Sequence, residues 1–339
     1  MNERLSLKEL AVKLHVSPST ISRVMNDKPG VGAKTRQRVL KAIQEHSYAP
    51  NNSARSLKTS KTGNIALISK KREDRLTSTD YFQRSISYIE GKLRKRGYHT
   101  IIMTLDDEEM ENTDNLLMLQ EKRVDGFIIR GPAIKPKFIL GLKNTGLPVV
   151  LMGNELRQVE IDCVVCQDRK GTYNITNHLI GHGHKKILFL SGPKGWYTND
   201  ERERGYKDAL QEKGLKNRII HMPDTTIDTG NDFFKEVVKT IYPDITAVVA
   251  VNDATAIGLM GAARNMGIKI PEDIAVVGFD DITWAALSYP PLTTVHTYLE
   301  EMGGLTISRL LDLLEKPNLH PTKSIVITDL VIRESCGCR

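Results

Sequence analysis

The chain has 339 residues, of which 40% are hydrophobic and 26% charged, a composition typical of a globular protein of roughly two or three domains. Its first residues lack the apolar core of a signal peptide, and no segment approaches the roughly 18 apolar residues of a membrane span. These features argue against a secreted or membrane-spanning protein. We therefore expect a cytoplasmic location.

The cysteines do not form a recognisable metal motif. Cys163 and Cys166 would face opposite sides of a strand, and Cys336 and Cys338 are separated by only one residue. We therefore expect free thiols, no bound metal and no cofactor.

Positive charge is concentrated at one end of the chain. Residues 1–63 contain 12 Lys and Arg against 4 Asp and Glu, whereas residues 64–339 contain 36 against 37. Because nucleic-acid binding draws much of its affinity from cations that neutralise phosphates, a small basic module favours DNA as a partner. A basic tail that is merely solvated is the alternative.

Two short helices are expected in this basic region. Ser6 and Glu9 have the spacing of a capping box, so a helix should begin at Leu7. Ser17 is a good N-cap and Pro18 a good first helical residue, so a second helix should follow after a short turn. Two helices joined in this way predict a helix-turn-helix.

The second helix has an apolar face and a polar face. Ile21 and Val24 should point inward, which leaves the outer face to Ser19, Thr20, Ser22, Arg23 and Asn26. Short hydroxyl and amide side chains with one Arg suit the major groove of DNA, although an inactive surface helix is the alternative.

A third helix is expected from Ala33 to about His46. Its inward side chains should be Val39, Leu40 and Ile43, and its start at Gly32 is poorly capped. Residues 51–62 then contain a single large apolar residue, so this tether should not fold alone.

From residue 64 onward, apolar runs alternate with amphipathic helical stretches, which predicts parallel sheets in two doubly wound lobes with a cleft between them. Strands are expected at 64–69, 98–104, 124–130, 147–152, 185–191, 245–251 and 273–279. Helices are expected at 81–96, 108–121, 135–143, 170–181, 201–213, 231–240 and 253–266.

The run LSLKELAVKLHVSPSTISRVMNDKPGVGAKTRQRVLKAIQEHSYAPNNSARSL resembles the DNA-binding head and hinge of the LacI/GalR family of bacterial transcriptional regulators. The resemblance implies that Pro18, Ser19 and Arg23 read bases. It also implies a hinge helix that forms on operator DNA, in which Leu57 enters the minor groove beside Ala54. The full set of expected DNA-binding residues is Ser6, Ser17, Pro18, Ser19, Thr20, Ser22, Arg23, Asn26, Tyr48, Asn51, Ala54 and Leu57.

The remainder resembles the family's effector domain, which has the fold of periplasmic sugar-binding proteins. The matching runs are VDGFII, GLPVVLM, HLIGHGHKKILFLSGP, RERGYKDAL, VNDATAIG, IPEDIAVVGFDD and PPLTTV. The resemblance implies effector contacts from Tyr81, Arg130, Asp168, Trp196, Arg202, Asn252 and Asp280. An Arg fork, carboxylates, amides and aromatic faces suit a polyhydroxylated ligand.

The expected domain organisation follows from the two resemblances. It comprises a helix-turn-helix head at 1–50, a hinge at 51–63 and an effector-binding and dimerisation domain at 64–339. The first lobe should span about 64–163 plus 294–321, and the second about 164–293 plus 322–339.

Some of these residues have plausible structural roles. Asn252 and Asp280 are as well suited to cap the helices that follow them as to contact a ligand. Trp196 suits either stacking on a sugar or ordinary packing. Lys70, Lys71 and Arg72 would attract an anionic ligand such as a sugar phosphate, but a solvated loop is the favoured interpretation.

No sequence motif for catalysis is present, and the histidines around Gly183 look like surface residues of a turn, so we do not expect an enzyme. We expect a homodimeric regulator of a pseudo-palindromic operator, most simply a repressor of carbohydrate-use genes controlled by a sugar, glycoside or sugar phosphate. An activator or global regulator with a non-sugar effector is the alternative, and a sugar receptor without a DNA role is a remote one. The effector's identity and the direction of its effect are beyond the sequence.

Overall fold

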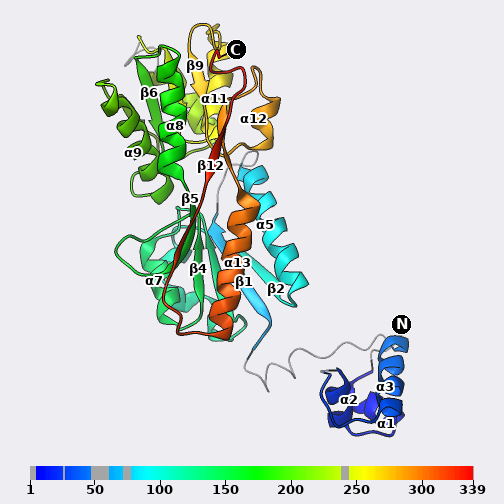
Figure 1. The fold of residues 1–339 in the computed structure, drawn as a ribbon. Helices are drawn as coiled ribbons and strands as arrows, with labels where there is room; N and C mark the ends of the chain where they lie inside the picture. Colours follow the sequence, from blue (N-terminus) through cyan, green and yellow to red (C-terminus); the bar gives the residue numbers. More distant parts are fainter. Residues whose placement is uncertain (1–4, 26, 47–60, 72–77, 238–243, 339) are drawn as a thin grey trace. The chain divides into compact units, whose positions relative to one another are not determined.

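The computed structural model describes residues 5–25, 27–46, 61–71, 78–237 and 244–338. These residues form two compact units, a head that ends at Gly63 and a body that begins at Asn64 (Figure 1). No helix in the described ranges is both long and apolar enough to cross a membrane.

The head consists of the three expected helices, α1 (Leu7–Lys13), α2 (Pro18–Met25) and α3 (Ala33–Glu45). Their small core is formed by the buried side chains of Leu10, Ala11, Ile21, Val24, Val39 and Ala42. Leu40 was expected inside but is 46% exposed, because the α3 stripe runs through Val39, Ala42 and the half-buried Ile43 instead. As expected, Gly32 provides no side-chain cap for α3.

The first lobe of the body is built on a parallel sheet with strand order β11-β5-β4-β3-β1-β2. Its strands are β1 (Asn64–Lys70), β2 (His99–Leu105), β3 (Gly126–Arg130), β4 (Val149–Met152), β5 (Asp162–Cys166) and β11 (Lys323–Val326). Alternate residues of β1 serve opposite faces of this sheet: Ile65 and Leu67 belong to one core cluster, and Ala66 and Ile68 to another.

Each face of this sheet is covered by helices (Figure 1). The face of Ile65 packs on α5 (Ser78–Lys95) and α13 (Leu299–Glu315). The face of Ile68 packs on α7 (Pro136–Asn144) and on residues of the connection from 109 to 120.

The prediction of a single helix at 108–121 is wrong for this connection. It consists of two 3-10 turns, η1 (Glu109–Glu111) and η2 (Thr113–Asn115), and a single turn of helix, α6 (Leu117–Gln120). The Asn112 side chain accepts a hydrogen bond from the Asp114 N–H at 2.9 Å, and Asn112 itself is extended. Short polar side chains of this kind offer the backbone an alternative to helical hydrogen bonds, which explains the break.

The second lobe has a parallel sheet with strand order β7-β6-β8-β9. Its strands are β6 (Ile187–Ser191), β7 (Ile219–His221), β8 (Ala247–Ala250) and β9 (Ala275–Val277). Its helices are α8 (Asp168–Gly181), α9 (Tyr197–Glu212), α10 (Ile227–Val237), α11 (Asp253–Asn265) and the short α12 (Thr283–Leu287). The closest helix packing joins α8 to α9 and α10 to α11.

The chain passes between the lobes after β5, between β10 (Thr294–Thr297) and α13, and between β11 and β12 (Thr328–Val331). β10 and β12 pair with each other as an antiparallel ladder. Since β5 and β11 belong to the first sheet, the sheet pairing continues to Cys166 and Val326, slightly beyond the lobe limits of about 163 and 321 expected from sequence.

Candidate functional site

In the head, the polar face of α2 begins at a well-formed helix cap. The Ser17 Oγ accepts a hydrogen bond from the Thr20 N–H at 3.1 Å and lies 2.7 Å from the Ser19 Oγ. Ser6 forms the expected capping box with Glu9, whose backbone N–H donates to the Ser6 Oγ at 3.2 Å. These caps fix the start of each helix and therefore the direction in which its first polar side chains point.

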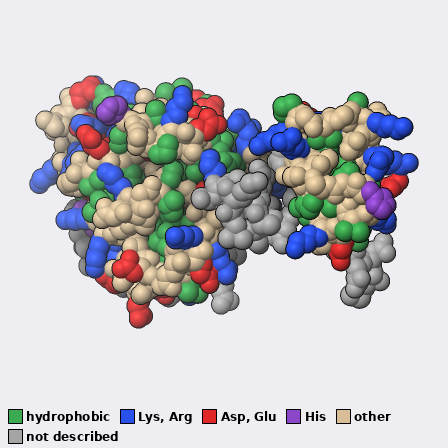
Figure 2. Space-filling model, turned by 90° about the horizontal axis from the view of Figure 1, so that it is seen from below, with side chains coloured by type: hydrophobic (Ala, Val, Ile, Leu, Met, Phe, Trp, Pro, Cys, Tyr) green, Lys and Arg blue, Asp and Glu red, His purple; other side chains and the backbone are tan. Residues whose placement is uncertain are grey.

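Several residues expected to contact DNA are accessible to it. Ser6, Ser17, Pro18, Ser19, Ser22 and Arg23 are exposed and Thr20 is half-buried. The view in Figure 2 shows Lys and Arg side chains with few acidic ones on the smaller unit, which is the head. The other expected residues, Asn26, Tyr48, Asn51, Ala54 and Leu57, lie outside the described residues.

Two cations of α3 hold the head together. The Arg36 guanidinium donates to Asp27 and to the Lys28 carbonyl, and Arg38 donates to the Leu14 carbonyl at 2.6 Å. The Leu14 carbonyl lies in the turn between α1 and α2, so Arg38 clamps the helix-turn-helix against α3. This structural use of arginine was not visible in the sequence, where both residues counted only as positive charge.

In the body, a cavity of about 280 Å³ opens between the two lobes. Its size is close to the lower end for small-molecule sites, which favours a small ligand. Most of the expected effector residues line it: Tyr81 and Arg130 from the first lobe, and Trp196, Arg202, Asn252 and Asp280 from the second. Asp168 is not among the lining residues but is bound to Arg202.

Arg202 is the buried centre of the second-lobe wall. Its Nε donates to Asp168 Oδ1 at 2.7 Å and its Nη2 to Asp280 Oδ1 at 3.0 Å. Its Nη1 donates to the Val251 carbonyl at 2.6 Å, and the guanidinium carbon lies 3.7 Å from the centre of the Phe279 ring. Three of the five N–H groups are thus committed to protein oxygens in the described structure, which leaves two for a ligand.

Burial sets the protonation behaviour of this cluster. Burial raises the pKa of Asp168 and of Asp280, and the Arg202 charge opposes that rise. Burial also disfavours the charge of Arg202, but Asp280 and Asp168 outweigh it and raise the Arg202 pKa further. Arg202 therefore remains a cation, and a ligand meets a fixed positive fork flanked by carboxylates.

The position of Arg202 depends on unusually close packing between α8 and α9. A Cβ atom at Gly205 would lie 2.0 Å from the carbonyl oxygen of Arg169. Only glycine therefore allows α9 to approach the first turn of α8, which carries Asp168. Gly205 and Arg202 are three residues apart on the same helix, so the close approach delivers Arg202 to its carboxylate.

We expect the substitution Gly205→Ala to lower the free energy of unfolding by about 1–3 kcal/mol, because the added methyl group forces the two helices apart. Urea denaturation of the purified chain measures this loss. Gly91→Ala is the matched control, since a Cβ there meets no atom within 4 Å and the change should be neutral or stabilising. Equal stability of both variants and the parent protein would contradict the packing argument.

Asp280 is held in an uncommon backbone conformation. Its φ is +114° and that of Asp281 is +54°, both in the region that favours glycine. The next residues are pinned in place: the Ile282 N–H donates to Asp253 at 2.9 Å, and Asp281 accepts from Arg333 at 2.6 Å. Strain that is retained in this way at a cavity wall indicates a residue positioned for function.

The first-lobe wall contributes a second cation. The Arg130 guanidinium lies 5.1 Å from the ring centre of Tyr81 and 4.9 Å from that of Phe82, both on α5. Cation–π contacts of this kind hold the side chain at the mouth of the first lobe. Lys70 and Lys71 also line the cavity, but Lys70 is paired with Asp107 at 2.9 Å.

The alternative roles considered for Asn252 and Asp280 have different outcomes. Asn252 caps α11, accepting from the Thr255 N–H at 2.9 Å, although its side chain also lines the cavity. Asp280 does not cap α12, whose N-cap is Ile282, and pairs with Arg202 instead.

Sequence reasoning missed the buried Asp253. Its carboxylate accepts hydrogen bonds from Thr294 and from the backbone of Ile282, so it connects α11, β10 and the Asp280 loop. Burial raises the pKa of Asp253 well above its ordinary value. The sequence did contain a signal for Asp253, because this residue directly follows Asn252 just after an expected strand.

Comparisons with known proteins agree with this arrangement. The family model for bacterial regulatory proteins of the lacI family matches residues 6–51, and that for the periplasmic binding protein-like domain matches residues 176–336. The first range contains the helix-turn-helix of the head, and the second contains most of the second lobe.

Similar proteins match over nearly the whole chain. The ribose operon repressor of Halalkalibacterium halodurans is 30% identical, with 97% of this chain and 96% of the repressor covered. The transcriptional repressor PurR of Pasteurella multocida is 31% identical, with 98% and 99% covered.

Solved structures extend the likeness to three dimensions. A complex of the regulator CelR with cellobiose is 28% identical, covers 98% of this chain and 100% of that chain, and has a TM-score of 0.73. A lac repressor dimer bound to operator and an anti-inducer is 24% identical, covers 98% and 99%, and shows the same fold with a TM-score of 0.85. The relatives are regulators and not enzymes. The helix-turn-helix head, the two parallel α/β lobes and the full-length similarity together show that the chain is a LacI-family transcriptional regulator with a periplasmic-binding-protein-like effector domain.

Proposed function

We propose that the protein is a sequence-specific repressor of carbohydrate-use genes, acting in the cytoplasm as a homodimer and controlled by a small sugar-class effector bound between its lobes. The observation that carries the effector proposal is the Arg202 fork, fixed between Asp168 and Asp280 and facing a cavity that is also lined by the first lobe. Hydroxyl groups of a sugar can accept from a guanidinium and donate to carboxylates, so one ligand would satisfy both.

Aromatic side chains support the same class of ligand. Trp196 and Tyr81 line the cavity on opposite lobes. The apolar faces of a sugar ring pack well against aromatic rings, while its rim of hydroxyls meets the polar wall. Two solved relatives carry sugars, CelR with cellobiose and a LacI-family regulator from Enterococcus faecium, 25% identical and with a TM-score of 0.70, with ribose.

Control of DNA binding requires that the effector favour one arrangement of the lobes. A ligand that touches both walls binds most tightly at one cleft width, and it shifts the population toward that width by its difference in affinity. We propose that this change is passed through residues 51–63 to a head at residues 1–50 that reads a pseudo-palindromic operator, with Arg23 as the principal base-reading side chain and Leu57 as the minor-groove wedge.

A thermal-shift screen of the full chain tests the effector class. Neutral sugars, sugar phosphates and nucleobases are added separately, and the unfolding midpoint is measured. A true effector should stabilise the chain by about 2.7 kcal/mol at 100 times its Kd, and it should also change the affinity for operator DNA. If only sugar phosphates stabilise the chain, we would infer that Lys71 and Arg130 bind the phosphate group of the effector.

A non-sugar effector is the second candidate, because Trp196 and Tyr81, which line the cavity, are also suited to stack on a flat heterocycle. Stabilisation by nucleobases with no response to any sugar would decide for this candidate and against the sugar proposal.

A further inference from the structure

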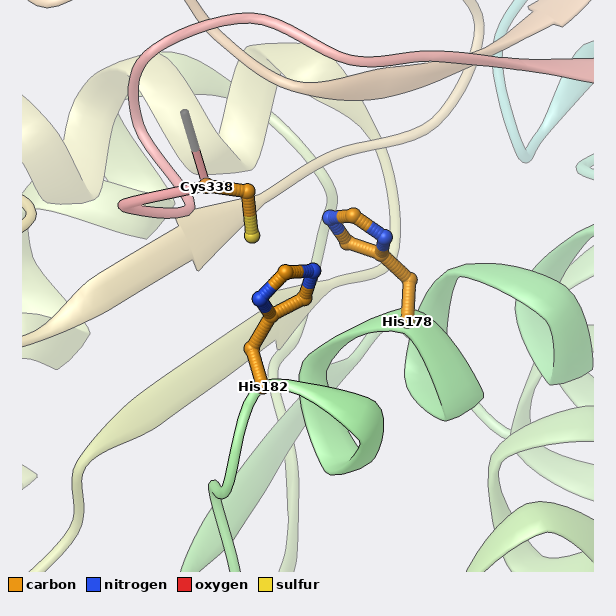
Figure 3. A group of neighbouring side chains, drawn as sticks. All are labelled: His178, His182 and Cys338. Carbon is orange, nitrogen blue, oxygen red and sulfur yellow. The ribbon is translucent and has the colours of Figure 1, made fainter.

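The described residues contain a cluster of metal-binding side chains far from the cleft. His178, in the last turn of α8, and His182, the C-cap residue that follows the helix, project toward Cys338 on the C-terminal tail (Figure 3). One ligand atom of each residue lies within 4.8 Å of the others. The two histidines are four positions apart on one helix, so they share a face and converge on one point.

His178 has a buried donor–acceptor atom that the protein leaves unused. Its Nε2 atom is buried and has no hydrogen-bond partner. A buried polar atom without a partner costs free energy unless something else satisfies it. The rings of His178 and His182 lie 4.7 Å apart and tilted, so one does not simply stack on the other to fill the space.

The tail places Cys338 opposite the histidines through a defined path. The Ser335 Oγ donates to the Val276 carbonyl at 2.6 Å and accepts from the Thr293 N–H at 2.8 Å, which fixes the tail on the second lobe. Gly337 then turns the chain with a φ of +75°. At this turn the Cys338 Sγ donates to the Cys336 carbonyl oxygen at 3.6 Å.

We propose that His178, His182 and Cys338 bind one zinc ion, which ties the C-terminal tail to the end of α8. Two imidazoles and one thiolate form a ligand set that favours Zn²⁺ over harder cations such as Mg²⁺ or Ca²⁺. Three protein ligands leave one position of a tetrahedral ion for water. On binding, the Cys338 thiol loses its proton to solvent and its sulfur forms the bond to zinc.

The ligand atoms of the cluster lie near one another, but a bound zinc ion requires them to move closer together. Zinc bonds of about 2.0–2.3 Å to nitrogen and sulfur require the ligand atoms to approach one another somewhat more closely than the 4.8 Å limit. Rotation of the half-buried His178, the exposed His182 and the half-buried Cys338 side chains provides this small contraction without moving α8.

The site is separate from the proposed effector cleft. α8 starts at Asp168, which binds Arg202, and reaches the cluster at its other end. Its 14 residues span about 21 Å at the usual rise of a helix. The zinc proposal therefore does not depend on the nature of the effector.

Metal titration of the full-length chain tests the proposal. The protein is first treated with a chelator in a non-thiol reductant, and Co²⁺ is added as a spectroscopic probe, followed by displacement with Zn²⁺. We expect one ion per chain and a thiolate-to-cobalt charge-transfer band. The substitution Cys338→Ser should remove that band, and His182→Asn should weaken zinc binding by at least about 100-fold, the upper end of the loss seen for outer-shell partners.

His184→Asn is the matched control. His184 is at the same turn but its Nδ1 pairs with Thr246 at 3.0 Å, so its loss should leave the band and the affinity unchanged. Circular dichroism of each metal-free variant verifies that it is folded. Absence of binding, cobalt bound without a thiolate band, or unaltered binding in the Cys338 and His182 variants would each overturn the proposal.

Discussion

Replacing Arg202 by alanine should abolish the response to effector while sparing the affinity of the head for DNA. The change removes the fork that faces the cavity and leaves the carboxylates of Asp168 and Asp280 without their cation. Loss of one partner from a buried ion pair typically costs about 3–5 kcal/mol, so the body should also be less stable. Partial protonation of the carboxylates, whose pKa burial already raises, will reduce this cost.

Two measurements separate the functional loss from the structural one. Fluorescence anisotropy with labelled operator, with and without effector, reports the response and the DNA affinity. Urea denaturation reports the stability of the body. Arg204→Ala on the same helix is the control, because the Arg204 side chain is 46% exposed and forms an ion pair with Glu201 at 2.6 Å. If the Arg202→Ala variant is folded and its affinity for operator still changes normally when effector is added, the assignment of Arg202 to the effector pocket is wrong.

The second large effect is expected at Arg23 in α2. Its side chain is exposed at the polar face of the helix, where a guanidinium can bind guanine through two hydrogen bonds. Arg23→Ala should therefore cost about 1–3 kcal/mol of binding free energy on operator and much less on random DNA, which reduces the ratio of the two affinities by up to roughly 5- to 150-fold.

Lys41→Ala provides the comparison for Arg23. Lys41 is on α3, is 77% exposed in its side chain, and pairs only loosely with Glu45 at 3.8 Å. Its removal should change operator and random DNA alike, and should lower the salt dependence if Lys41 neutralises a phosphate. If Arg23→Ala lowers both affinities by the same factor, Arg23 contacts the phosphate backbone of DNA, and the sequence specificity comes from other residues.

The sequence predicted those features whose cause is local. The capping box at Ser6 and the cap at Ser17 placed the first two helices correctly, because a cap depends on residues only three apart. Apolar runs such as Ile65 to Ile68 placed the first-lobe strand, because strands buried on both faces are almost continuously apolar.

Other features had a local signal that was not used. The helix α13 (Leu299–Glu315) was not predicted, although Leu299, Met302, Thr306 and Leu310 recur at helical spacing and are all buried. Conversely, the helix expected at 108–121 is broken because Asn112 bonds to nearby backbone, a competition that hydrophobic periodicity does not report.

The geometry of the candidate site depends on contacts between distant residues. Arg202 meets Asp168, 34 positions away, and Asp280, 78 positions away, only because α9 packs closely on α8 and the Asp280 loop is pinned by Asp253. Family resemblance indicated which residues face the cleft, but it did not reveal that Arg202 is already bound by two carboxylates. Likewise, the approach of Cys338 to His178 and His182 is a product of tertiary folding alone.

The short β10–β12 ladder limits how the two lobes can move. Because paired strands resist sliding, opening and closing should occur as a swing about this ladder. β1 has its far end, Lys70, at the cavity and its first residue, Asn64, about 20 Å away at the usual rise of a strand. A swing of about 10° would displace Asn64 by roughly 3–4 Å over that lever arm. Such a swing would thus displace the point where the body begins by about as much as the spacing of successive Cα atoms.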